Sequence, residues 1–217
     1  MNSIQVTAER VKETGIIAIV RGDYSESQVV TIAETLARTG IFALEVTLNS
    51  RDALRHLELL RKRFPDLLIG AGTVRESAEA TSAIAAGAQF LVSPNFDRDS
   101  VSLSLQAGVL HLPGVFTATE AQTAYAHGCH LVKLFPADVN GPSYLKALRA
   151  PLDRIGFVPT GGITPDNLGD YVTAGAVALG AGSALVGAPG QDPAELAARA
   201  KAFVSTLASA RSANRPR

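Results

Sequence analysis

Short apolar runs alternate with amphipathic segments along the chain. A parallel strand buried on both faces reads as a continuous apolar run, whereas a crossover helix has apolar residues at helical spacing. The alternation therefore predicts a parallel sheet whose strands are joined by helices. The expected strands are 16–20, 43–48, 67–71, 90–93, 109–112, 131–135, 156–159 and 176–180. The expected helical segments include 25–39, 51–64, 76–86 and 119–127.

Glycines and capping residues mark where these helices end and begin. A glycine between a helical segment and a strand can adopt the left-handed conformation that ends a helix. Such glycines are Gly40, Gly87, Gly108, Gly128 and Gly175. Thr117 and Thr164 each precede residues that favour a first helical turn, so helices are expected to begin there.

Eight strand–helix units predict a single (β/α)8 TIM barrel over residues 1–217. Its core is expected at about 10–208, with 209–217 forming a disordered tail. A doubly wound open sheet is the alternative. In a barrel, functional residues lie on the loops after the strands.

Composition narrows the class of protein. The chain has 217 residues, 47% hydrophobic and 18% charged, and its formal net charge is zero. Without a basic cluster in the predicted fold, we expect no nucleic-acid or membrane partner. We find no signal peptide or membrane-spanning stretch, and the single cysteine, Cys129, rules out an intrachain disulfide. These features predict a cytoplasmic protein.

One lysine, Lys133, lies in the middle of an apolar run. Alternation along a strand places Leu131, Lys133 and Phe135 on one face. Burial removes the hydration of an ammonium and lowers its pKa, and a neutral amine can form a Schiff base with a carbonyl substrate. The alternative is a strand-end lysine whose head reaches water.

The second expected strand carries a carboxylate, Glu45, on one face with Ala43 and Thr47. The aliphatic face should meet the helices, which leaves Glu45 pointing into the barrel, where an unpaired carboxylate is costly. With Lys133 also pointing inward, we expect a site in which each group perturbs the pKa of the other. A solvent-facing charge and a purely structural partner for the lysine are the alternatives.

Glycine-rich turns follow the last two expected strands. They are Thr160-Gly161-Gly162 and Gly180-Ala181-Gly182-Ser183. Such turns expose backbone N–H groups, and this part of a barrel commonly binds phosphate. Plain tight turns are the alternative.

The four histidines show no spacing typical of a metal site. We therefore expect no metal and no cofactor. His111 is expected to be a hydrogen-bonded core histidine, and Cys129 a buried structural thiol.

Motifs on most of the strands resemble the 2-keto-3-deoxy-6-phosphogluconate (KDPG) aldolase family, over about residues 10–188. They are Leu44-Glu45-Val46-Thr47-Leu48, Gly70-Ala71-Gly72-Thr73-Val74, Val92-Ser93-Pro94, Lys133-Leu134-Phe135-Pro136 and Pro159-Thr160-Gly161-Gly162-Ile163. The resemblance implies a class I, metal-independent aldolase on a (β/α)8 barrel, usually a homotrimer. Its members cleave KDPG to pyruvate and glyceraldehyde 3-phosphate, and some act on the galactonate epimer or on 4-hydroxy-2-oxoglutarate.

The resemblance also implies roles for individual residues. Lys133 would form the Schiff base, and Glu45 would be the general acid/base that relays protons through a bound water. The expected substrate-binding residues are Arg21, Thr47, Asn49, Thr73, Pro94, Phe135 and Thr160. The expected phosphate-binding residues are Gly161, Gly162, Gly182 and Ser183.

One position departs from the family pattern. Several members carry an arginine at the end of the second strand to bind the substrate carboxylate, whereas this chain has Asn49. We expect Arg21, at the end of the first strand, to bind the carboxylate or the phosphate through the two-pronged hydrogen bonding of a guanidinium. Leu48-Asn49-Ser50 and Pro94-Asn95 also resemble galactonate-type members, so the epimer preference stays open.

Two other functions would fit some of these features. A phosphate-binding barrel isomerase or synthase would have the same glycine-rich turns, although it has no evident need of a buried amine. A non-catalytic phosphosugar-binding protein would use Lys133 only to pair with the charge of its ligand.

Overall fold

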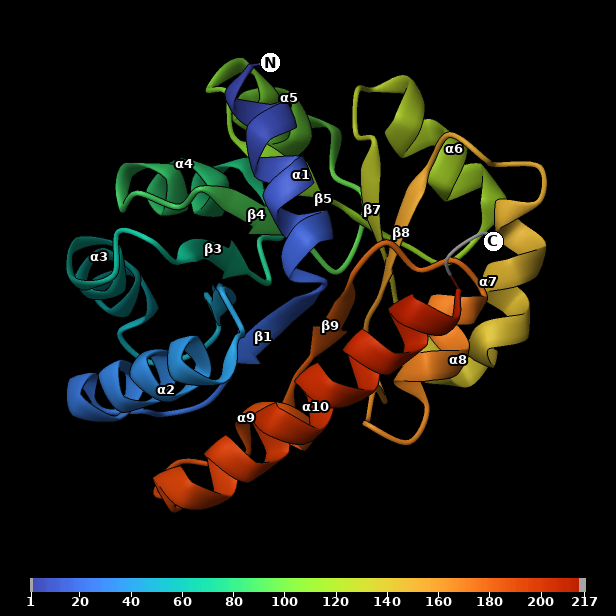
Figure 1. The fold of residues 1–217 in the computed structure, drawn as a ribbon. Helices are drawn as coiled ribbons and strands as arrows, with labels where there is room; N and C mark the ends of the chain where they lie inside the picture. The colour runs from blue at the N-terminus through green and yellow to red at the C-terminus, as the bar shows by residue number, and fades with distance from the viewer. Residues whose placement is uncertain (1, 215–217) are drawn as a thin grey trace.

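The computed structural model, which describes residues 2–214, is an α/β fold with a curved parallel sheet surrounded by helices (Figure 1). The strands are β1 (Ile16–Val20), β2 (Ala43–Thr47), β3 (Leu68–Gly72), β4 (Phe90–Val92), β5 (Leu110–Leu112), β6 (Gly114–Val115), β7 (Leu131–Leu134), β8 (Gly156–Pro159) and β9 (Leu179–Ala181). Six adjoin in the order β5-β4-β3-β2-β1-β9, and three in the order β6-β7-β8. This largely sequential order, with β9 beside β1, differs from the reversed order of a doubly wound sheet.

The eight expected strands are present, with two differences. The fifth is divided into β5 and β6 at Pro113, which has no N–H to donate to a neighbouring strand. The last was expected at 176–180 but lies at Leu179–Ala181, because the chain bends at 177 and 178 after α8.

The helices are α1 (Ser3–Thr14), α2 (Glu26–Thr39), α3 (Ala53–Arg63), α4 (Ser77–Ala85), α5 (Arg98–Gln106), α6 (Ala118–Ala126), α7 (Gly141–Arg149), α8 (Leu168–Thr173), α9 (Ser183–Val186) and α10 (Pro193–Ala213), with a short 3-10 helix, η1 (Ala137–Val139). The five glycines expected to end helices all have left-handed backbones, with φ between 72° and 97°. Thr117 begins α6 through a capping box with Glu120, as predicted. None of the helices in residues 2–214 is long and apolar enough to cross a membrane.

The predicted helix start at Thr164 is wrong, because α8 begins at Leu168. The amide side chain of Asn167 explains the difference. It accepts a hydrogen bond from Thr164 N at 2.9 Å and donates one to Gly162 O at 2.7 Å. These bonds hold the segment before Leu168 in a turn that competes with a helix.

The predicted disordered tail is also partly wrong. Helix α10 continues to Ala213, beyond the expected boundary at 208. Arg211 ties it to α1 by donating to Lys12 O at 2.5 Å and to Glu13 O at 2.8 Å. Residues 215–217 of the predicted tail lie outside the described residues.

Apolar side chains form two layers. One large cluster fills the space between the sheet and the helices. A smaller cluster lies on the inner side of the sheet and joins Ile17, Leu68, Phe90 and Leu131 to Val11 of α1. Helix α1 crosses the end of the sheet at which the strands begin (Figure 1). The ends of the strands, where the predicted polar residues lie, are therefore at the opposite end of the sheet from α1.

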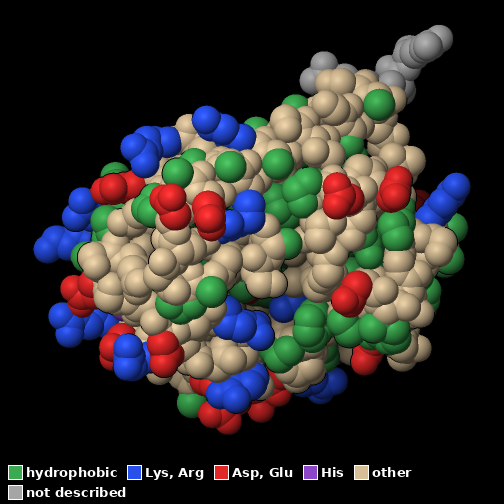
Figure 2. Space-filling model, turned by 90° about the horizontal axis from the view of Figure 1, so that it is seen from below, with side chains coloured by type: hydrophobic (Ala, Val, Ile, Leu, Met, Phe, Trp, Pro, Cys, Tyr) green, Lys and Arg blue, Asp and Glu red, His purple; other side chains and the backbone are tan. Residues whose placement is uncertain are grey.

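Charged side chains are mixed over the surface. On the face shown in Figure 2, positive and negative groups are interspersed and neither sign covers a large area. This distribution agrees with the zero net charge of the sequence.

Candidate active site

Lys133 and Glu45 both point to the inner side of the sheet. On β7, Lys133 shares its face with Leu131, and on β2, Glu45 shares its face with Ala43. Leu131 and Ala43 both belong to the inner apolar cluster. Only 3% of Lys133 and 2% of Glu45 are exposed. The predicted inward orientation of both side chains is therefore confirmed.

Burial perturbs the pKa of both groups in the directions that favour their neutral forms. Desolvation lowers the pKa of Lys133, and Arg21 lowers it further, while the charge of Glu45 opposes the shift. Desolvation raises the pKa of Glu45 against the opposing effects of Lys133 and Arg21. Glu45 Oε1 is buried without a hydrogen-bond partner in residues 2–214. A buried carboxylate with a free oxygen beside a buried amine can exchange a proton with a substrate group or a water.

A cavity of about 430 Å³ opens where the strands end. Eight of the residues predicted for the site line it: Arg21, Lys133, Phe135, Thr160, Gly161, Gly162, Gly182 and Ser183. Lys133 Nζ lies 4.6 Å from the centroid of the Phe135 ring. The structure therefore brings the predicted amine and both predicted phosphate-binding turns to one cavity.

Arg21 and Thr73 meet although they follow different strands. Arg21 Nη2 lies 3.2 Å from Thr73 Oγ1, to which it donates a hydrogen bond. Thr73 has a φ of 59°, which is rare for a β-branched residue. Strained backbone of this kind concentrates at functional sites. Thr73 itself is not among the residues that line the cavity.

Three other predicted substrate-binding residues lie outside the cavity lining. Thr47 is fully buried, and its hydroxyl bonds Ser50 Oγ at 2.9 Å, while Ser50 Oγ accepts from Gly22 N at 3.0 Å. Thr47 therefore supports the loop that carries Arg21. Asn49 is exposed, which corrects its expected place in the pocket, because the alternation of β2 ends at Thr47. Pro94 packs its carbonyl against Gly114.

Several lining residues were not among those predicted to bind the substrate or its phosphate, although Gly180 belongs to a predicted glycine-rich turn and Ile163 to a family motif. They are Ile19, Ile163, Thr164, Gly180, Ala184 and Gly187. Ile163 and Thr164 directly follow Gly161-Gly162, and this position could have indicated them. Gly187 follows the short helix α9, which the periodicity did not predict.

The predictions for His111 and Cys129 are confirmed. The two ring nitrogens of His111 bond Ser104 Oγ at 2.9 Å and Ser93 Oγ at 3.1 Å, and burial lowers its pKa to about 4. Burial raises the pKa of the Cys129 thiol to about 12. Among residues 2–214, we find no group of three or more His, Cys, Asp or Glu side chains that could hold a metal ion.

Comparison with known proteins agrees with this geometry. The family model described as KDPG and KHG aldolase matches residues 7–198. The chain belongs to this family of aldolases, and it is a carbon–carbon lyase. Family membership favours an aldolase over a phosphate-binding isomerase, a synthase or a non-catalytic sugar binder.

Individual relatives cover most of the chain. The 2-dehydro-3-deoxy-phosphogluconate aldolase of Pseudomonas aeruginosa is 40% identical to this chain, and the matched region covers 74% of this chain and 73% of the length of that aldolase. The 2-dehydro-3-deoxy-6-phosphogalactonate aldolase of Escherichia coli K12 is 35% identical over 87% of this chain and 92% of its own. The solved KDPG aldolase of Legionella pneumophila, with pyruvate captured as a covalent carbinolamine, is 30% identical over 92% of this chain and 96% of its own, with a TM-score of 0.79.

Proposed function

We propose that this chain uses Lys133 to cleave a 2-keto-3-deoxy-6-phospho sugar acid into pyruvate and glyceraldehyde 3-phosphate. The observation that carries the proposal is the buried Lys133 in the lining of the cavity, where desolvation lowers its pKa and so favours the neutral, nucleophilic amine. The covalent carbinolamine of the Legionella relative is the first adduct expected when such an amine adds to pyruvate. Loss of water from that carbinolamine gives an imine, and reduction of the imine with borohydride in the presence of pyruvate tests the proposal.

The proposed cleavage needs only Lys133, a proton carrier and water, and its atoms and electrons balance at each step. The Lys133 amine adds to the ketone at the second carbon, and loss of water gives a protonated imine. A base removes the proton of the hydroxyl on the fourth carbon, and the bond between the third and fourth carbons breaks. Its electron pair moves into the imine to form an enamine, and the aldehyde leaves. Protonation of the third carbon and addition of water then release pyruvate, with Glu45 carrying the protons.

Arg21 is proposed to bind the substrate carboxylate. It lines the cavity with Lys133, and its bond to Thr73 orients the guanidinium. Loss of a hydrogen bond to a charged group removes about 1.5–3 kcal/mol, so Arg21→Ala should raise KM by about 10- to 100-fold. Arg21→Lys keeps the charge but loses the two-pronged geometry. Its KM should therefore lie between those of the wild type and Arg21→Ala. Steady-state cleavage kinetics measure this effect, and an unchanged KM in Arg21→Ala would assign the carboxylate to another group.

The phosphate is proposed to bind at Gly161, Gly162, Gly182 and Ser183. These residues line the cavity, and glycines allow the backbone N–H groups to approach an anion closely. The unphosphorylated alternative substrate, 4-hydroxy-2-oxoglutarate, cannot use this contact. A comparison of kcat/KM for the two substrates tests the assignment, which predicts a preference for the phosphorylated one.

The same kinetics can decide between the gluconate and galactonate epimers. The resemblance to galactonate-type members rested partly on Asn49, which is exposed and does not line the cavity. Asn49 therefore provides no structural support for a preference. The ratio of kcat/KM for the two epimers measures it.

Gly72 is proposed to position the Glu45 carboxyl group. A methyl group on Gly72 would lie 2.8 Å from Glu45 Cδ and 3.2 Å from Thr47 Cγ2. Gly72→Ala should therefore displace the carboxyl group and lower kcat by about 10- to 100-fold, because a small misplacement of a catalytic group has a large effect on rate. The matched control is Gly169→Ala, where the nearest atom to the new methyl would be Ala210 Cβ at 3.8 Å. Wild-type kcat in Gly72→Ala would contradict this role.

The two sheets are proposed to form one closed (β/α)8 barrel and a single domain. Three contacts support this proposal. Lys133 N donates to Pro113 O at 2.9 Å, Val177 N donates to Phe157 O at 3.0 Å, and Thr160 pairs with Gly180 in a parallel bridge. These contacts join β7 to the break in the fifth strand and β8 to the segment that includes β9. A single cooperative unfolding transition is expected.

The chain is further proposed to act in the cytoplasm as a homotrimer. Family resemblance supports the trimer, and the buried free thiol of Cys129 fits a reducing compartment. A trimer would have about three times the 22.6 kDa mass of the chain. Light scattering coupled to size exclusion measures that mass, and cell fractionation tests the location.

A further inference from the structure

The backbone segment 185–187 supports one of the two proposed phosphate-binding turns. Val186 N donates to Gly182 O at 2.8 Å, and Gly187 N donates to Ser183 O at 3.0 Å. Gly187 also lines the cavity beside Gly182 and Ser183. A displacement of Gly187 would therefore displace the turn to which it is bonded.

Side chains from two other parts of the chain bind the carbonyl groups of this segment. Arg199 of α10 donates from Nε to Leu185 O at 3.0 Å and from Nη2 to Val186 O at 3.5 Å. Gln191 also donates to Val186 O and accepts from Arg199. The hydroxyl of Tyr24, from the loop after β1, donates to Gly187 O at 3.0 Å. All three carbonyls of the segment are thus held by side chains.

Gly187 itself has an unusual backbone conformation. Its φ of 79° and ψ of −151° lie in a region that only glycine adopts readily. A side chain there would meet Arg199 Nη2 at 2.7 Å. Such a backbone persists where its surroundings determine it.

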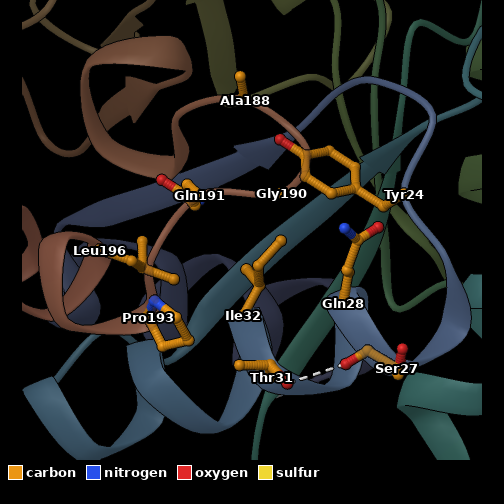
Figure 3. A pocket seen from close by; sticks show the side chains of 10 residues that line it. All are labelled: Tyr24, Ser27, Gln28, Thr31, Ile32, Ala188, Gly190, Gln191, Pro193 and Leu196. Atoms are coloured by element: carbon orange, nitrogen blue, oxygen red, sulfur yellow. Dashed lines mark hydrogen bonds between the residues drawn. The ribbon is translucent and has the colours of Figure 1, made fainter.

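A hollow lies between α2 and the residues that directly follow the segment. A hollow of about 150 Å³ separates Ala188, Gly190 and Gln191 from Ile32 and Thr31 of α2. Figure 3 shows the Tyr24 ring beside this hollow, with its hydroxyl directed toward the segment. Leu185 and Val186 are buried in the large apolar cluster, whereas the residues after Gly187 border the hollow. The Tyr24 bond is the contact that ties Gly187 O to the loop after β1.

Tyr24 is a buried hydrogen-bond donor that connects two loops of the proposed site. Its side chain is 3% exposed, and burial raises its pKa against the opposing effect of Arg199, so its hydroxyl stays a protonated donor at neutral pH. Tyr24 follows Arg21 on the same loop. It therefore links the loop of the proposed carboxylate-binding residue to the loop behind the phosphate turn.

We propose that Tyr24 is a positioning residue that, by holding Gly187, sets the affinity of the cavity for the phosphate end of the substrate. This inference rests on the proposed function. A neutral hydrogen bond contributes about 0.5–1.5 kcal/mol, so Tyr24→Phe should raise KM for the phosphorylated substrate by about two- to tenfold. The exchange of pyruvate methyl protons with deuterated water uses Lys133 and Glu45 but no phosphate, so its rate should not change.

The matched control is Tyr144→Phe. The Tyr144 hydroxyl also donates to a loop carbonyl, Phe116 O, at 2.6 Å, but neither residue lines the cavity. This variant should keep the wild-type KM and exchange rate. An unchanged KM in Tyr24→Phe, or an equal loss of pyruvate exchange, would overturn the role of Tyr24. If the wild-type protein itself failed to exchange pyruvate protons, the proposed function would be overturned, and this inference with it.

Discussion

Lys133→Met should abolish turnover, with kcat falling by at least about 10⁴-fold, the scale of loss seen when an enzyme loses its nucleophile. Without the amine there is no imine to accept the electron pair of the breaking carbon–carbon bond. Methionine keeps much of the length of the side chain and removes a group whose charged form is desolvated. It also leaves Glu45 buried without the amine that favours its charged form, so the free energy of unfolding should stay the same or fall. Cleavage kinetics and chemical denaturation measure the two effects separately.

Lys146→Met is the matched control, because Lys146 is exposed on α7. It should retain wild-type kcat and KM. Turnover by folded Lys133→Met within tenfold of wild type would show that the reaction needs no imine at this residue.

Glu45→Gln should lower kcat by about 10²- to 10⁴-fold, the usual contribution of a general acid or base. Glutamine has nearly the shape of glutamate but cannot carry a proton between substrate atoms. Lys133 remains, so pyruvate should still form an adduct, although more slowly. Glu58→Gln, at an exposed position of α3, is the control and should behave as wild type.

Glu45→Gln should also shift the pH dependence of adduct formation, in a direction that follows from the charge of Glu45. The charge of Glu45 raises the pKa of Lys133, against the larger lowering by desolvation. Without that charge the pKa of Lys133 should fall further, so the amine is neutral at lower pH. The acidic limb of a pH profile of adduct formation should therefore move to lower pH. A shift to higher pH, or no shift, would show that the two groups do not interact as described.

Alternation along buried strands was enough to predict that Lys133 and Glu45 point to the inner side of the sheet. Lys133 and Glu45 each lie inside a regular strand, where side chains point to opposite faces in turn. Both strands were visible as short apolar runs, so both inward faces followed. The glycine turns that line the cavity were predictable for a similar reason, because they directly follow strands β8 and β9.

Prediction failed where side chains rather than periodicity fix the backbone. The alternation of β2 does not extend to Asn49, which is exposed instead of facing the pocket. The amide of Asn167 holds a turn where capping rules indicated a helix start. Tyr24 and Gly187 are 163 positions apart in the chain. No local pattern encodes such a contact, so only the folded structure shows it.

The central claim is that Lys133 forms an imine with pyruvate, and borohydride reduction followed by peptide mass mapping tests it most directly. The protein is incubated with pyruvate, reduced, digested and mapped at every lysine. We predict a reduced pyruvyl adduct on Lys133 alone, which is lost in Lys133→Met and retained in Lys146→Met. A folded protein that carries no adduct, or carries it on another lysine, would contradict the proposed mechanism.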